Sequence, residues 1–156
     1  MEIEPWWFTV TPYEGESISH FLGRFRRENV LTVSGLGKIT GLYGAIARWE
    51  KFRFNPPPSL EQLEKLSAIV QVEVATLQTM FPSAPMKMTP IRLCSVCYGE
   101  KPYHRMKWQY KEIYKCERHQ VKLLSECPNC GARFKFPALW VDAWCHRCFT
   151  PFADYT

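Results

Sequence analysis

The sequence predicts a small α+β protein in which a helical, helix-turn-helix-like domain precedes two tandem ribbon or knuckle modules. Two patterns support this prediction. Apolar residues recur at helical spacing as far as residue 81, and all seven cysteines lie between Cys94 and Cys148. A stretch with three prolines separates the two patterns. We therefore expect a helical domain with an N-terminal arm over residues 1–81, a linker over residues 82–91 and a cysteine-rich domain over residues 92–156.

The first 15 residues mix aromatic residues with helix breakers, which predicts an extended arm that ends in a turn. Trp6 and Trp7 dominate this arm. The pattern favours an arm that packs its rings on the domain's own core. The alternative is an exposed anchor for a partner, because Trp is enriched at binding hot spots.

Ser17 is a suitable N-cap for a first helix that runs to about Asn29, where we expect a left-handed end. Its buried stripe has helical spacing and comprises Ile18, Phe21, Leu22 and Phe25. His20, Arg24 and Arg27 lie away from that stripe. They predict a solvated basic face or, alternatively, contacts with phosphates or an acidic partner.

Three further helices are expected. Ile39, Leu42, Ile46 and Trp49 predict a second helix ending near Glu50, after a connection loosened by glycines. A capping box of Ser59 and Gln62 opens a third helix, whose expected buried positions are Leu60, Leu63 and Leu66. The fourth helix would bury Val74, Leu77 and Met80 or Phe81.

The third and fourth helices have helix-turn-helix proportions. A DNA-reading second helix needs Arg, Lys, Asn or Gln at base edges and phosphates. Residues 71–80 contain neither Lys nor Arg, and they include Glu73. We therefore expect this pair to be a scaffold that packs or binds protein rather than one that reads bases.

The cysteine-rich stretch contains four pairs of potential metal ligands, each with two residues between its members. They are Cys94 and Cys97, Cys116 and His119, Cys127 and Cys130, and Cys145 and Cys148. Two such pairs complete one tetrahedral zinc site. An odd count of seven cysteines would leave a thiol over in a disulfide framework. Two structural zinc ions, one with three cysteines and a histidine and one with four cysteines, use every thiol.

Two pairing schemes are open. Sequential sites join the first pair with the second and the third with the fourth, and short loops favour this scheme. Cross-braced sites would join alternate pairs, as in ubiquitin-ligase-like modules. In both schemes every ligand position is filled, so we expect no catalytic metal and no enzyme. We expect a strand pair or hairpin over residues 103–114, and surface positions for the two remaining histidines, His104 and His146.

The formal net charge is +5, but basic and acidic residues balance before Arg92. Seven thiolates and two divalent ions would lower the net charge to about +2, which weakens the case for a cationic DNA-binding surface. Reduced thiols, the zinc spacing and the lack of a secretion signal or membrane-length apolar run predict a cytoplasmic protein without a membrane partner.

Two stretches resemble the TniQ family. The first runs from Pro12 to Ser19 and continues through Phe21, Leu22, Arg24 and Asn29. The second holds the first two ligand pairs with Trp108 between them, then Leu123 or Leu124 and the Cys127-Pro-Asn-Cys-Gly131 turn. The short chain is similar to the compact TniQ of CRISPR-associated transposons that use a single-protein effector.

The resemblance implies a non-catalytic adaptor in RNA-guided DNA transposition. Such an adaptor links the target-selecting CRISPR effector and its guide RNA to the AAA+ ATPase regulator, with target DNA contacted indirectly. Trp6, Trp7, His20, Arg24 and Arg27 are the candidate partner contacts. The alternative, based on the helix pair and the surplus of Lys and Arg, is a zinc-dependent DNA-binding regulator.

Overall fold

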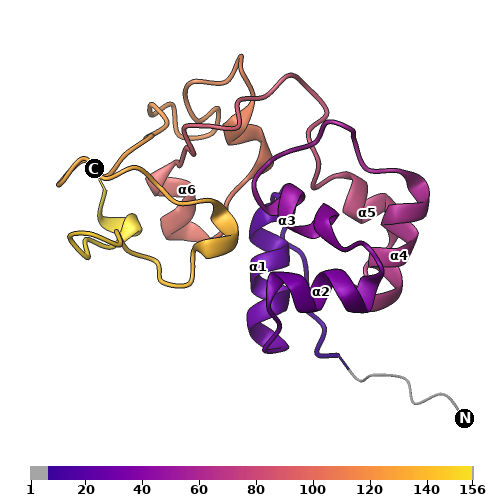
Figure 1. Cartoon of the computed structure of the whole chain (residues 1–156). Helices are drawn as coiled ribbons and strands as arrows, with labels where there is room; N and C mark the ends of the chain where they lie inside the picture. The colour runs from indigo at the N-terminus through magenta and orange to yellow at the C-terminus, as the bar shows by residue number, and fades with distance from the viewer. Residues whose placement is uncertain (1–6, 156) are drawn as a thin grey trace, which may run out of the picture.

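The computed structural model describes residues 7–155. The chain folds into two halves that lie side by side, a helical half and a cysteine-rich half (Figure 1). The helical half contains α1 (Ile18–Glu28), α2 (Val33–Thr40), α3 (Gly44–Glu50), α4 (Leu60–Val70) and α5 (Val74–Gln78). The cysteine-rich half contains α6 (Ser95–Glu100) and the 3₁₀ helices η1 (Met106–Gln109), η2 (Pro137–Leu139) and η3 (Phe152–Asp154).

The strands expected of an α+β fold do not form in the described residues. Chain pairing there is limited to isolated β-bridges, and the hairpin expected over residues 103–114 is replaced by the 3₁₀ helix η1. Gln109 explains the difference, because its buried side chain bonds the Arg92 amide and the carbonyls of Lys87 and Pro90. The aromatic stretch therefore wraps around one polar side chain instead of pairing with itself.

The first helix forms where the sequence predicts it. The Ser17 hydroxyl caps α1 by accepting from the His20 amide, and the predicted stripe of four apolar residues is fully buried. The left-handed end is displaced by one residue, because Asn29 keeps a φ of −104° while Val30 takes +53°. The Asn29 side chain instead hydrogen-bonds the backbone of Phe8 and fixes the N-terminal arm.

The expected second helix is two helices, α2 and α3. Gly41, with φ of +74°, ends α2, and the chain turns back so that the Tyr43 amide donates to the Gly37 carbonyl. A Cβ on Gly37 would lie 2.7 Å from the Tyr43 carbonyl oxygen, so this close return requires glycine. The glycines that predicted a loose connection therefore allow a tight helical corner.

The third and fourth helices form where predicted, but two of their expected buried positions differ: Val74 is only partly buried and Leu60 is exposed. The Ser59–Gln62 capping box forms, and Leu63, Leu66 and Val70 are buried. Leu60 is 59% exposed, because as the first helical residue it lies outside the stripe that faces the core. Helix α5 spans only five residues, which is short for a helix that enters a DNA groove.

Two hydrophobic clusters form the cores of the two halves, and the loop after α3 connects them. Phe52, with φ of +58°, turns its ring away from the helical core and into the cysteine-rich one, where it contacts His104 and Phe136. Residues 82–91 also pack on this half, since Met86 bridges to Tyr110 and the Lys87 amide donates to the Gln109 carbonyl.

The two halves meet where α1 packs on η2. Gly23 in α1 is buried so closely that a Cβ there would lie 2.3 Å from the Ala138 carbonyl oxygen. Ser19 accepts from the Ala138 amide at 3.0 Å and donates to the Glu50 carbonyl at 2.7 Å. A glycine and a short hydroxyl thus bring the backbones of α1 and the 3₁₀ helix η2 into direct contact.

Candidate metal centres

The structure gathers the eight predicted ligands into two clusters. The first comprises Cys94, Cys97, Cys116 and His119, and the second comprises Cys127, Cys130, Cys145 and Cys148. Within each cluster the ligand atoms all lie within 4.8 Å of one another. The grouping is sequential along the chain rather than cross-braced.

The spacing of the donor atoms matches a tetrahedral metal site. With Zn–S bonds of about 2.3 Å, two sulfurs of a regular tetrahedron lie about 3.8 Å apart. The closest Sγ–Sγ distances are 3.5 Å in the first cluster and 3.5 and 3.6 Å in the second. The His119 Nδ1 lies 3.3 to 3.7 Å from the three Sγ atoms of its cluster. These separations exclude disulfides, whose bond is about 2.0 Å long.

Three of the four ligand pairs share one backbone motif. In each, the first ligand's amide donates to the carbonyl five residues later, and the residue after the second ligand donates back to the first ligand's carbonyl. That residue has positive φ, and the three are Gln120, Gly131 and Phe149. A β-bridge closes each motif: Lys115 to Lys122, Glu126 to Arg133, and Trp144 to Pro151.

The remaining pair is built on a helix. Cys94 caps α6 by accepting from the Cys97 amide, and Cys97 follows one turn later on the same face. The bridge between Leu93 and Leu124 then brings this helix to the Cys116 motif. The first cluster therefore joins a helix to a knuckle, whereas the second joins two knuckles.

The thiols are arranged so that a cation would stabilise them. Burial, together with the neighbouring Cys116 and Cys94 thiols, raises the pKa of Cys97 to about 12. By contrast, the Thr150 hydroxyl, 3.2 Å from the Cys148 Sγ, lowers the pKa of Cys148 to about 5. Several thiolates cannot share so small a space without a compensating positive charge. Both clusters are therefore compatible with binding one metal ion each.

Groups around the clusters that the sequence did not single out complete the centres. Glu100 accepts from the His119 Nε2 at 3.0 Å. Arg105 donates to the Cys97 carbonyl and stacks on Tyr103. The buried Tyr155 hydroxyl has no partner by hydrogen-bond geometry but faces Cys127, whose thiolate would accept from it. No spacing rule marks such residues, because they come from outside the ligand pairs.

The prediction that His20, Arg24 and Arg27 form a solvated basic face on α1 is wrong. His20 is 2% exposed and bonds the buried Glu16 carboxylate. Arg24 donates to Glu16 and the Thr11 carbonyl and lies over the Tyr13 ring. The reason is that this face of α1 is covered by the N-terminal arm and the cysteine-rich half.

Arg27 belongs to the same covered face. Its guanidinium donates to the Ala138 carbonyl at 2.8 Å and so connects α1 to η2. All three residues of the predicted basic face therefore make contacts within the molecule.

The aromatic arm is only partly described, because Trp6 lies outside the described residues. Trp7 is half-buried against the helical core, whereas Phe8 is 67% exposed. Packing on the domain's own core is therefore what the structure shows for Trp7.

The prediction of two surface histidines is half wrong. His146 is exposed, but His104 is fully buried at the junction of the halves. Its Nδ1 lies 2.9 Å from the Ser17 hydroxyl and its Nε2 lies 3.2 Å from the Gln109 amide oxygen. Burial holds the pKa of His104 well below its usual value, so the ring is neutral.

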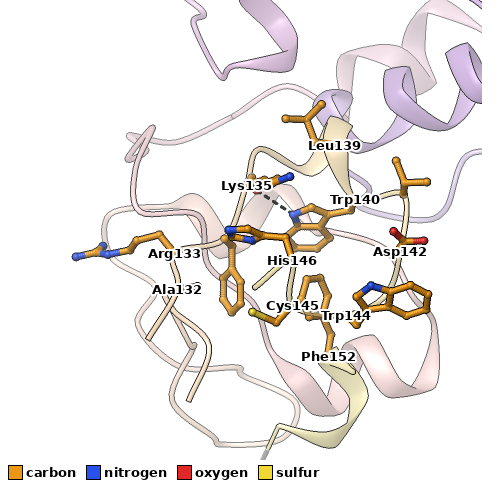
Figure 2. A pocket seen from close by; sticks show the side chains of 12 residues that line it. Ala132, Arg133, Lys135, Leu139, Trp140, Asp142, Trp144, Cys145, His146 and Phe152 are labelled. Carbon is orange, nitrogen blue, oxygen red and sulfur yellow. Dashed lines mark hydrogen bonds between the residues drawn. The ribbon is translucent and has the colours of Figure 1, made fainter. Parts of the chain in front are cut away.

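A cavity of about 150 Å³ adjoins the second cluster (Figure 2). Trp140 forms its inner wall and donates its indole N–H to the Lys135 carbonyl, while His146 lies across it between Arg133 and Trp144. Trp144 is 44% exposed and Val141 is 65% exposed. These side chains form an apolar surface beside the candidate metal.

Two sets of four donors, each compatible with one metal ion, beside a helical half define a small protein with two candidate metal centres. The sequence profile of the TniQ family matches residues 7–123, which is more than half of the chain and includes the first cluster, and the chain belongs to this family. The family is associated with transposition and is generally non-catalytic. A search of curated proteins gives no match. Within residues 7–155, no helix is long and apolar enough to cross a membrane.

Proposed function

We propose that both clusters hold zinc and that the protein is a non-catalytic adaptor in RNA-guided DNA transposition. It would connect the target-selecting CRISPR effector, with its guide RNA, to the AAA+ ATPase that regulates the transposase. The family match is the observation that carries this proposal.

Zinc is the ion that the donor sets favour. Thiolates in a tetrahedral arrangement select zinc or iron, and a histidine among the ligands suits zinc. Four protein donors in each cluster leave no position for water or substrate, so the ions would stabilise the fold rather than perform chemistry. Elemental analysis of the purified chain should find two zinc ions per molecule. A chain that folds without metal would contradict the proposal that the ions stabilise the fold.

The two-part architecture of the molecule supports an adaptor role. Two halves with separate cores are joined where α1 packs closely on η2, so a partner on one half is held in a fixed position relative to a partner on the other. Helix α5 offers no Lys or Arg to DNA, which favours the adaptor over a zinc-dependent DNA-binding regulator.

Reconstituted integration tests the proposal. Targeted insertion should require the chain in a mixture of effector, guide RNA, ATPase, transposase and donor DNA, and unchanged targeted insertion without it would refute the adaptor role. The isolated chain should bind duplex DNA weakly at physiological salt. Tight binding with a steep salt dependence would favour the DNA-binding regulator instead.

A further inference from the structure

Glu100 lies behind the histidine ligand of the first cluster and is not itself one of the eight candidate ligands. It is the last residue of α6, the helix that carries Cys94 and Cys97. Its Oε1 accepts from the His119 Nε2 at 3.0 Å, and its Oε2 pairs with Arg118 at 2.9 Å. One carboxylate thus connects the helix of the first ligand pair to His119 of the second pair and to Arg118, which lies between the two ligands of that pair.

This contact fixes which nitrogen of His119 carries the proton. A neutral imidazole has one N–H donor and one acceptor nitrogen. Because Nε2 must donate to the Glu100 carboxylate, Nδ1 keeps the lone pair that a metal ion requires. Nδ1 is the nitrogen that faces the three Sγ atoms. The ring is therefore held in the tautomer and the orientation of a ligand.

The second cluster has no equivalent. It contains no histidine, and in the described part of the chain no hydrogen bond or ion pair joins a carboxylate to its four cysteines. Its polar neighbours include the Thr150 hydroxyl, which contacts the Cys148 Sγ and accepts from the Asn129 amide. The two clusters therefore differ in how their ligands are oriented, and each can serve as the control for the other.

We propose that Glu100 is a positioning residue for the first metal ion. It holds His119 in the metal-binding tautomer and keeps the two ligand pairs together, and it thereby raises the affinity of the first cluster but not of the second. This inference rests on the proposal that the clusters hold zinc. Carboxylates that orient a metal-bound histidine typically contribute 10- to 100-fold in metal affinity.

The test compares zinc affinity in the full-length chain by competition with chelators of graded strength. Glu100→Ala should lower the zinc affinity of one of the two sites about 10- to 100-fold and leave the affinity of the other site unchanged. Glu100→Gln, which keeps a neutral acceptor, should fall between this variant and the natural chain. Glu112→Gln is the matched control, because Glu112 is exposed and makes no hydrogen bond or ion pair among those of the described residues.

The visible spectrum of the cobalt-substituted chain identifies the weakened site, because a centre with three sulfurs and one nitrogen absorbs differently from a centre with four sulfurs. Loss confined to the histidine-containing centre supports the proposal. Unchanged affinity in Glu100→Ala, or equal weakening of both centres, overturns it. If the natural chain binds fewer than two ions, the zinc proposal itself fails, and that result is separate from any effect of Glu100.

Discussion

The packing of Gly23 on η2 makes Gly23→Ala the sharpest test of how the halves are joined. The new Cβ would lie 2.3 Å from the Ala138 carbonyl oxygen and 2.7 Å from its Cα. Ordinary contact begins near 3.4 Å, so α1 and η2 must separate by roughly 1 Å at this point. Neither neighbour is a flexible side chain that could rotate away.

The expected loss of stability comes from the contacts between α1 and η2 that this separation disturbs. Overpacking of this kind destabilises by about 1–3 kcal/mol. The bonds from Ala138 to Ser19 and Arg27 would also lengthen, and the bond to a charged group contributes about 1.5–3 kcal/mol. Alanine stabilises a helix interior by about 0.5–1 kcal/mol relative to glycine. We therefore expect a net loss of about 2–4 kcal/mol in the free energy of unfolding.

Urea unfolding of the metal-loaded chain, followed by circular dichroism, measures this loss. Gly99→Ala is the matched control, because Gly99 is also helical and its Cβ would lie 3.7 Å from the Ala153 Cβ, an ordinary contact. We expect the control to be neutral or slightly stabilised. If Gly23→Ala unfolds at the same urea concentration as Gly99→Ala, the close contact between the halves is not as described.

Three further predictions concern the cores, the metal and pH. Phe52→Ala should destabilise the chain by about 3–5 kcal/mol in urea unfolding, because the ring fills the cysteine-rich core; a loss below about 1 kcal/mol would contradict this. Cys130→Ser should lower the bound zinc from two ions to one in elemental analysis, and retention of both would argue against a separate second centre. Burial lowers the pKa of His20 and of His104, so the unfolded chain binds their protons first and stability should fall as pH drops below about 6.5. Between pH 7 and 5.5 the natural chain should lose about 1 kcal/mol more than His104→Gln, whereas equal losses would show that His104 is not buried neutral.

Spacing rules predicted the parts of the fold that depend on neighbours in sequence. The cap at Ser17, the buried stripe of α1 and the capping box of α4 are local, and all three formed. The two ligand clusters could also be predicted from the sequence. The spacing of two residues between ligands is a local pattern, and short loops favoured the sequential grouping.

Features that depend on the other half of the chain could not be predicted. His20, Arg24 and Arg27 lie on the polar side of α1, and only the packing of η2 and the N-terminal arm covers them. The positive φ after the second ligand was expected at Gly131 alone, because Gln120 and Phe149 carry no sequence mark for that conformation. The hydrogen-bonded turn around the two ligand positions imposes it on the residue that follows.

The stretch by which this chain resembles its family has a consequence for comparing relatives. Tyr13, Glu16, Ser17 and Arg24 all turn inward and bond other parts of the same molecule. A shared version of this stretch thus reports that two proteins have the same internal skeleton. These four contacts report on that skeleton directly, whereas the proposed partners rest on the family match as a whole.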